Sequence, residues 1–324
     1  MRALVTGGAG FIGGHIARDL KRRGYYVIVA DNLSTGNRSN LKGIDEFHEL
    51  DLGKDDISSI FEKEYDLIYH FAGQSSVEIS YSDPIYDLDT NVRSTLNIIN
   101  NIKHYTKKVH LIYASSMSVY GGDEPMPKRE DSPLDGKNFY AIGKKASESY
   151  LSLCSSRKIK TTSLRLFNIY GPGQNLENLN QGMLSIYLAQ AINNDKIIVK
   201  GTLDRSRDFV YIKDLIRLTN KIENNPSCYG KILNICSGKE TKVSELISAI
   251  EIALNKKLTI LEQVSTKGDI KRMIGCNNLL KEITGIKIET NIQDGLNLMI
   301  KALEANKFSG HPTRSWSGLA VERP

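Results

Sequence analysis

The chain has few cysteines: its 324 residues include four, at positions 154, 228, 236 and 276. No two of them form C-x-x-C and none has a His at zinc-like spacing, so we expect no metal site. Scattered single cysteines also argue against a disulfide-stapled scaffold and are typical of a reducing compartment. No apolar run approaches the roughly 18 residues of a transmembrane helix, so we expect no contact with a membrane.

Charge of one sign is not concentrated in any segment. The formal net charge is +6 and the pI about 8.9, but the basic run at 21–23 and the Lys pairs alternate with Asp and Glu. Nucleic-acid binding would need a dense basic stripe with interleaved aromatics, so no nucleic-acid partner is expected. The modest positive bias suits a small phosphorylated substrate.

Size and composition are ordinary for a globular protein. Hydrophobic residues make up 40% and charged residues 25% of the chain. At roughly 150 residues per domain, this length predicts about two domains. The first ten residues, MRALVTGGAG, enter a structural motif with no secretory signal ahead of it, so a cytoplasmic location is expected.

Short β-branched runs alternate with helical patterns over the first half of the chain. This order predicts an α/β fold, a Rossmann-type doubly wound parallel sheet with helices on both faces. The expected strands are 3–6, 26–30, 47–50, 66–71, 109–114 and 161–166, and the expected helices are 11–24, 56–63, 84–105 and 139–155.

The alternation loosens after the Gly-Pro-Gly at 171–173, which indicates a smaller mixed α/β lobe that binds substrate. We expect helices at 182–193, 243–254 and 292–305 there, with strands at 197–199 and 209–212. The expected division is a dinucleotide-binding domain over 1–166 and a lobe over 167–306, with some segments returning to the sheet. Residues 307–324 are expected to form a mobile tail.

A glycine-rich turn between the first strand and first helix predicts a dinucleotide site. Gly8, Gly10 and Gly13 satisfy G-x-G-x-x-G, and Gly7 gives a second spacing, G-x-x-G-x-x-G. Glycines let the backbone approach a pyrophosphate, and the helix N-terminus supplies amide donors. Asp31 ends the next strand and can accept from both ribose hydroxyls while repelling a 2′-phosphate, which favours NAD over NADP.

Two further strand ends extend this candidate site. Asp51-Leu52 follows the third strand and would lie beside the adenine, and Phe71-Ala72-Gly73 follows the fourth, where small residues let the cofactor pass. Each segment, taken alone, is equally typical of a common loop.

Ser, Tyr and Lys side chains form the candidate catalytic group. Ser116 lies at the end of the fifth strand, and Tyr140 and Lys144 share one face of the following helix because they are four residues apart. A neighbouring ammonium favours the phenolate, which makes Tyr140 a candidate general base near neutral pH.

With these segments in place, the chain resembles the extended short-chain dehydrogenase/reductase family, in particular its NAD-dependent nucleotide-sugar epimerases, over about residues 1–303. The motifs that carry the resemblance are TGGAGFIG from residue 6, DNLS from 31, HFAG from 70, SSMSVYG from 115, YAIGK from 140, RLFNIYGPGQ from 165 and RDFVYIKD from 207.

The resemblance implies that Tyr140 is the acid/base, Lys144 its partner and a ligand of the nicotinamide ribose, and Ser116 a hydroxyl near the reacting sugar oxygen. The implied NAD-binding residues are Gly7, Gly10, Phe11, Ile12, Gly13, Asp31, Asn32, Ser34, Asp51, Leu52, Phe71, Ala72, Gly73, Asn91, Tyr140 and Lys144. The implied substrate-binding residues are Ser75, Ser116, Asn168, Arg207, Asp269 and Met273. A surface ion pair with Asp204 or Asp208 is the alternative for Arg207.

Departures from the family pattern narrow the expected reaction. The dehydratases and decarboxylases of the family carry a glutamate just after the Ser/Thr, whereas this chain has Met117 and Ser118. The family's R-x-G-D clamp for phosphate and ribose reads Thr266-Lys267-Gly268-Asp269, so its arginine is absent. Lys267, Lys271 or Arg272 are the candidate replacements. Met273 stands where the family's UDP-hexose epimerases limit sugar size.

We therefore expect an NAD-dependent epimerase that inverts C4 of a nucleotide-activated sugar, with UDP-hexoses leading, through a 4-keto intermediate. The alternatives are a nucleotide-sugar reductase or dehydrogenase, an epimerase of a CDP-, GDP- or ADP-linked sugar, and a non-catalytic NAD-binding regulator. The resemblance also implies a homodimer through the helices at 84–105 and 139–155, although packing on the sheet would equally explain their apolar faces.

Overall fold

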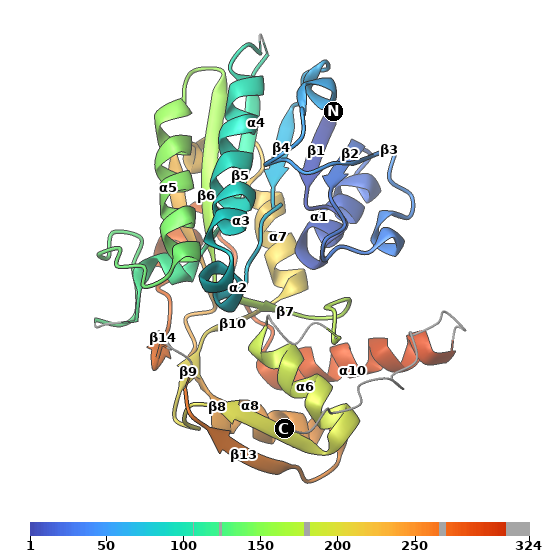
Figure 1. Cartoon of the computed structure of the whole chain (residues 1–324), viewed down its shortest axis with the longest axis vertical. Coiled ribbons are helices and arrows are strands. Elements are labelled where there is room, and N and C mark those ends of the chain that lie inside the picture. The colour runs from blue at the N-terminus through green and yellow to red at the C-terminus, as the bar shows by residue number, and fades with distance from the viewer. Residues whose placement is uncertain (106, 123–124, 178–181, 266–269, 309–324) are drawn as a thin grey trace.

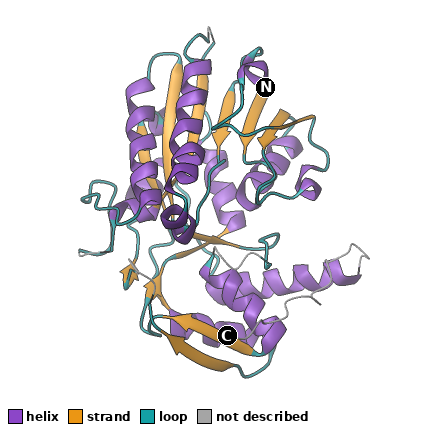
Figure 2. Ribbon diagram, in the orientation of Figure 1, coloured by secondary structure: helices purple, strands orange, loops and turns teal. Residues whose placement is uncertain are grey.

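The computed structural model describes residues 1–308 apart from 106, 123–124, 178–181 and 266–269; for 306–308 it describes the backbone alone. Its centre is a sheet of seven parallel strands in the order β11-β6-β5-β4-β1-β2-β3 (Figure 1, Figure 2). The strands are β1 (Arg2–Thr6), β2 (Tyr26–Asp31), β3 (Glu46–Glu49), β4 (Leu67–His70), β5 (Val109–Ser116), β6 (Ile159–Leu166) and β11 (Lys231–Ile235). The predicted Rossmann-type parallel sheet is confirmed.

Helices cover both faces of this sheet and give it two cores (Figure 1). On one face, α1 (Phe11–Arg22) and α7 (Ile212–Ile222) pack against strand side chains such as Val5. On the other, α4 (Ser94–Ile102) and α5 (Phe139–Cys154) pack against Leu4 and its neighbours. Burial on both faces explains why the strands read as continuous apolar runs rather than as alternating ones.

Residues beyond 166 build a smaller lobe and also return to the sheet through β11 and α7. Strand pairs β7–β10 and β8–β13 are parallel, and a three-stranded sheet has the order β12-β9-β14. The lobe's remaining elements are β7 (Asn168–Tyr170), β8 (Lys196–Lys200), β9 (Ser206–Arg207), β10 (Phe209–Tyr211), β12 (Thr241–Lys242), β13 (Thr259–Gln263), β14 (Arg272–Met273), α6 (Met183–Asn194), α8 (Val243–Leu254), α9 (Asn278–Thr284) and α10 (Ile292–Phe308). The division at residue 166 stays a prediction.

Three predicted elements need correction. The helix expected at 56–63 is one 3₁₀ turn, Ser58–Phe61. The strand expected to reach residue 212 ends at Tyr211, because α7 begins at Ile212. The helix expected at 84–105 consists of α3 (Pro84–Leu88), a π-helical turn at Asp89–Arg93, and α4, and it is preceded by α2 (Val77–Ser82). A π turn adds one residue to the ladder, which rotates the side chains that follow.

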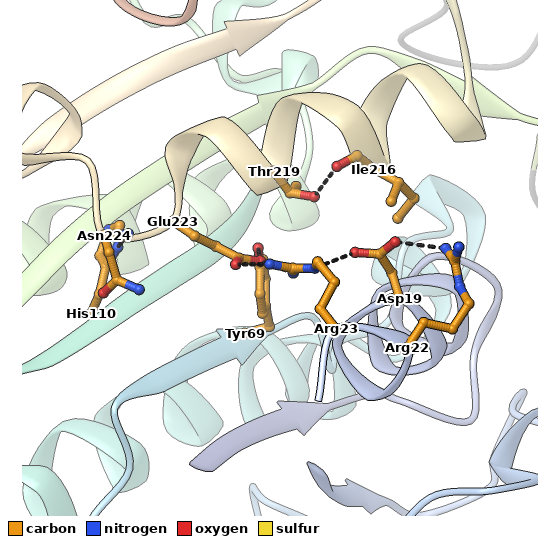
Figure 3. A network of polar contacts seen from close by, with 9 residues as sticks. All are labelled: Asp19, Arg22, Arg23, Tyr69, His110, Ile216, Thr219, Glu223 and Asn224. Carbon is orange, nitrogen blue, oxygen red and sulfur yellow. Dashed lines mark hydrogen bonds and ion pairs between the residues drawn. The ribbon is translucent and has the colours of Figure 1, made fainter. Parts of the chain in front are cut away.

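A network of ion pairs and hydrogen bonds fixes α7 against the N-terminal elements (Figure 3). The Arg23 guanidinium donates twice to the Glu223 carboxylate, at 2.7 Å each, and the Tyr69 hydroxyl donates to the same carboxylate at 2.5 Å. Arg23 also donates to Asp19 on α1. Because Glu223 follows α7 directly, this network ties the end of α7 to α1 and β4.

Within the described residues, no helix combines the length and apolarity needed to cross a membrane. In the same part of the chain, no three His, Cys, Asp or Glu side chains gather where they could hold a metal ion.

Candidate active site

The glycine turn passes tightly against the segment that follows β4. Gly7 has a φ of +69°, and a Cβ built there would lie 2.6 Å from the amide nitrogen of Ala72. A Cβ on Gly13 would lie 2.2 Å from the carbonyl oxygen of Gly7. Any side chain at either position would force these backbone segments apart, so both glycines are required by packing.

The N-terminus of α1 leaves its first amide groups available to a ligand. Its N-cap, Gly10, has no side chain that could accept from these amides, and the first turn, which contains Phe11 and Ile12, has no acidic residue. Unsatisfied amides at the positive end of a helix form a site for an anion such as a pyrophosphate.

Asp31, at the end of β2, lies beside this turn. Its carboxylate accepts from the backbone amides of Ala9 at 3.0 Å and Leu33 at 2.8 Å. Burial raises the pKa of Asp31, and hydrogen bonds from Leu33, Ala9 and Gly10 partly oppose that effect. The backbone therefore orients the carboxylate at the edge where a ribose would lie.

The other residues predicted around the adenosine lie at the same edge, near β3. The Asn32 side-chain amide donates to Asp51 at 3.1 Å, and the Ser34 backbone amide donates to Asn32 at 3.0 Å. Leu52 is buried beneath them. The structure thus brings these strand-end residues together as predicted.

A chain of polar contacts organises the segment after β4. The Ala72 amide donates to the Thr6 hydroxyl at 3.2 Å, and buried His70 lies between the hydroxyls of Thr6 and Thr95, at 2.9 and 3.0 Å. Burial lowers the pKa of His70 to about 3, so the ring is neutral. Thr95 lies outside every motif of the sequence, because a Thr inside a helix carries no distinctive pattern.

Asn91 lies in the π-helical turn and is 1% exposed. Its side-chain amide donates to the Gln74 carbonyl and to Asp87, at 3.1 Å each. Its Oδ1 has no hydrogen-bond partner among the described residues and points at Gly73, where a Cβ would lie only 2.5 Å away. A buried acceptor without a donor is costly, and a ligand passing Gly73 could satisfy it.

Ser116, Tyr140 and Lys144 converge at the carboxyl end of β5. Ser116 ends the strand and accepts from the Ser118 hydroxyl at 2.9 Å and the Ser118 amide at 3.2 Å. Tyr140 and Lys144 lie one turn apart on α5, with the Lys144 ammonium 5.7 Å from the centre of the Tyr140 ring. That ammonium also donates to the Ala114 carbonyl at 2.9 Å, which fixes it next to the strand end.

Burial shifts the pKa values of this pair in opposite directions. Loss of solvent raises the pKa of Tyr140 to about 12, although the side-chain hydrogen bond with Ser116 lowers it. Loss of solvent lowers the pKa of Lys144 to about 8, opposed by the negative charges of Asp87 and Glu148. Near pH 7 the ammonium is therefore still charged, and it faces a phenol that needs a cation to ionise.

The carboxylate of Glu148, one turn beyond Lys144, belongs to a buried network that sequence reasoning missed. Arg165 on β6 donates to both of its oxygens, at 2.9 and 2.8 Å, and the Ser115 hydroxyl donates to it at 2.5 Å. Arg165 also donates to the Tyr120 hydroxyl at 2.8 Å. The partners come from separate elements, so no local spacing predicts them.

The lobe contributes Asn168 and Arg207 to the same side of the sheet. The Asn168 side chain donates to the Asp208 carbonyl at 2.8 Å and lies 3.7 Å from the Met117 sulfur. Arg207 is buried, with 8% of its surface exposed, and donates to the Ser206 carbonyl at 2.8 Å. Burial of Arg207 is not what the surface ion-pair alternative predicts.

Three other residues are predicted to meet the substrate: Met273, Ser75 and Asp269. Met273 pairs with Arg207 between β14 and β9 and is fully buried in a cluster with Phe167 and Cys236, so it does not reach an open surface. Ser75 is exposed, just before α2. Asp269 lies outside the described residues, as do Thr266 and Lys267.

A cavity of about 1150 Å³ opens in the lobe beside Gln263 and Ser265. Arg205 and Lys271 line it. Arg272, by contrast, donates to both oxygens of Glu240, at 2.8 and 2.7 Å. Of the candidate replacements for the clamp arginine, Lys271 therefore faces open space and Arg272 is engaged elsewhere.

Comparison with known proteins gives the same picture over nearly the whole chain. The family described as "NAD dependent epimerase/dehydratase family" matches residues 3–236. A putative UDP-glucose 4-epimerase of Methanocaldococcus jannaschii is 32% identical over 305 residues, covering 94% of this chain and 98% of that protein. UDP-glucuronic acid decarboxylase 3 of Arabidopsis thaliana is 29% identical, with 92% and 88% covered.

Among solved structures, the UDP-glucose 4-epimerase of Thermotoga maritima with UDP-glucose superimposes with a TM-score of 0.90 at 28% identity. The match covers 95% of this chain and 100% of that one.

Proposed function

Because the chain belongs to the NAD-dependent epimerase/dehydratase family, whose members act on nucleotide sugars, we propose that it is a 4-epimerase of a nucleotide-activated hexose. UDP-hexoses are the proposed substrate class. The observation that carries the proposal is a buried Ser116–Tyr140–Lys144 group in which Met117 and Ser118 follow the serine in place of a glutamate.

The dinucleotide edge of the sheet has what NAD requires. Gly7 and Gly13 leave room for a pyrophosphate at the uncapped N-terminus of α1, Asp31 is placed for the ribose hydroxyls, and the unpaired Asn91 oxygen faces Gly73. When bound, NAD supplies reversible hydride transfer at C4 of the sugar. An epimerase restores its own cofactor in each cycle, so purified protein should carry about one NAD(H) per chain and little NADP(H).

Tyr140 is the proposed acid/base of both half-reactions. Its phenolate takes the proton of the 4-hydroxyl as the alcohol is oxidised, and its phenol returns a proton to the oxygen when the ketone is reduced from the other face. The Lys144 ammonium stabilises the phenolate, and the Ser116 hydroxyl donates to the sugar oxygen in both orientations. Between the two steps the 4-keto sugar turns over in the pocket.

Met117 and Ser118 favour epimerisation over the reactions of other relatives. A dehydratase needs an acid to expel a hydroxyl, and the glutamate that the family's dehydratases and decarboxylases carry there is absent. Here Ser118 donates to Ser116, and Met117 faces Asn168. A reductase would use the same Ser, Tyr and Lys but would consume one NAD(P)H per product, and that is the outcome to test against.

The nucleotide is proposed to extend from Ser116 across the lobe. Asn168 and Arg207 are the proposed contacts of the diphosphate, and Ser75 of the sugar. Lys271, in the lobe's cavity, is the proposed replacement for the clamp arginine. Buried Met273 would act on sugar size only through the residues that cover it, such as Met117.

A homodimer through α3, α4 and α5 is part of the proposal. Apolar side chains on these helices stay exposed although the sheet takes up the opposite faces: Leu153 is 84% exposed, Ile85 66% and Ile142 58%. Adjacent exposed apolar side chains on packed helices mark a protein–protein interface. The reducing, cytoplasmic location stays a proposal as well; all four cysteines are unpaired thiols.

The experiment that tests the function is an assay without added cofactor. Purified protein is incubated with UDP-, dTDP-, GDP- and CDP-sugars, and products are separated by anion-exchange chromatography and identified by NMR. The proposal expects a C4 epimer from a UDP-hexose, with Tyr140→Phe as the negative control. A reduced or dehydrated sugar as the sole product would contradict it.

A further inference from the structure

The candidate active site contains a buried carboxylate, that of Asp87, which no part of the proposed reaction uses. Asp87, on α3, is 1% exposed. Helix α3 packs directly against α5, the helix of Tyr140 and Lys144 (Figure 1). A buried aspartate requires hydrogen bonds and a nearby cation, because an isolated ionised carboxylate is costly to desolvate.

Two neutral amides hold Asp87 by a single oxygen. The Gln74 side chain donates to its Oδ1 at 2.6 Å and the Asn91 side chain at 3.1 Å. Gln74 is held in turn by the backbone of Ser76, to whose carbonyl it donates at 2.7 Å. These bonds orient the carboxylate but contribute no positive charge.

The other oxygen faces α5. A Cβ built on Gly143 would lie 3.7 Å from Asp87 Oδ2, so the carboxylate lies against α5 between Tyr140 and Lys144. The Lys144 ammonium lies near the same group of side chains, 3.4 Å from the position of a Cβ on Gly73, which itself is beside Asn91.

The charges around Lys144 leave Asp87 as its counter-ion. Glu148 also raises the pKa of Lys144, but less than Asp87 does, and both of its oxygens accept from Arg165. Burial raises the pKa of Asp87; the hydrogen bonds from Gln74 and Asn91 lower it, and Lys144 is the cation whose charge lowers it further. The titratable or charged groups around this cluster are Tyr140 and Glu148 on α5, Tyr113 on β5, His70 on β4 and Arg165 on β6.

We propose that Asp87 is a positioning residue for the proposed epimerase reaction: it holds Lys144 as an ammonium, so that Lys144 can stabilise the Tyr140 phenolate. The inference rests on the proposed function, since it assigns Asp87 a part in the same proton transfer. Asp87 acts through Lys144 and does not itself contact the reacting atoms.

The sign of the effect follows from the two charge states. Removing the carboxylate removes the attraction that favours the ammonium, so the pKa of Lys144 falls from about 8. An opposite charge within about 4–6 Å shifts a pKa by about 1–3 units. Deprotonated Lys144 cannot stabilise a phenolate. The fall of activity on the alkaline side of the pH profile should therefore begin at a lower pH in the variant. Loss of the repulsion between Asp87 and Tyr140 lowers the pKa of Tyr140, so activity on the acidic side of the profile should persist to lower pH.

The test is Asp87→Asn, which keeps the shape and the oxygen that accepts from Gln74. Two measurements are made on the full-length protein with its bound cofactor: the titration of the Lys144 side chain by NMR after ¹³C-lysine labelling, with its signal assigned from Lys144→Met, and the pH profile of kcat. Asp83→Asn is the matched control, because it removes the same charge from the exposed N-cap of the same helix, and Asn also caps a helix well.

We expect Asp87→Asn to lower both the pKa of Lys144 and the midpoint pH of the alkaline limb of kcat by at least ~1 unit. Asp83→Asn should leave both values unchanged. A merely structural Asp87 would reduce kcat by the same factor at every pH with the Lys144 titration unchanged, and that result would overturn the proposal. If Asp87→Asn does not fold, the reciprocal measurement decides: in Lys144→Met the pKa of Asp87 must rise, and an unchanged value refutes the pairing. The lysine titration requires no epimerase activity, so failure of the proposed function remains distinguishable.

Discussion

Replacing Arg165 with Met should destabilise the protein more than any surface substitution. The side chains of Arg165 and Glu148 are 2% and 3% exposed. Arg165→Met leaves the Glu148 carboxylate buried with only the Ser115 hydroxyl as donor. Stranding one partner of a buried ion pair costs about 3–5 kcal/mol. At roughly 2–3 °C per kcal/mol for a chain of this size, Tm should fall by roughly 6–15 °C.

Differential scanning calorimetry at neutral pH measures this loss. The double variant Glu148→Leu with Arg165→Met should recover much of the stability, since a well-packed apolar pair needs no counter-ion. A single variant that loses less than about 1 kcal/mol would refute the account of this network.

Three further substitutions test the site and the assembly. Tyr140→Phe should lower turnover by at least ~10²-fold with NAD content unchanged, measured by product formation, whereas Tyr150→Phe on the same helix should keep full activity. Gly13→Ala should yield protein without bound NAD, measured in the supernatant after denaturation, because its Cβ must displace the glycine turn; Gly14→Ala, with no contact under 3.2 Å, is the control. Leu153→Lys should convert a dimer into a monomer by light scattering, whereas Ile252→Lys in the lobe should not.

The glycine turn, Asp31 and the Tyr140–Lys144 pair could be predicted because each depends on short-range spacing. A glycine turn between a strand and a helix has one geometry that brings a pyrophosphate to the helix N-terminus. Residues four apart on a helix share a face whatever surrounds them. The order of strands and helices similarly predicted the parallel sheet.

The residues that the sequence did not reveal depend on packing between distant segments. An Asp in the middle of a helical pattern reads as solvent-exposed, whereas Asp87 is buried because α3 packs against α5, a helix from a distant part of the chain. The Arg165–Glu148 pair joins a strand to a helix in the same way. The sequence did not reveal α7, because its first residue, Ile212, continues the apolar run of β10. The change from the two-residue repeat of a strand to the roughly 3.6-residue repeat of a helix lies inside that run.

The most direct test of the proposed C4 inversion is the reaction of a UDP-hexose in D₂O, followed by proton NMR of the product sugar. If C4 is inverted by oxidation and re-reduction within one closed site, the hydrogen on C4 never meets solvent. The product is then the C4 epimer with no carbon-bound deuterium, and added NADH is neither required nor consumed. Deuterium at C3, C5 or C6, or loss of one NADH per product, would contradict the account.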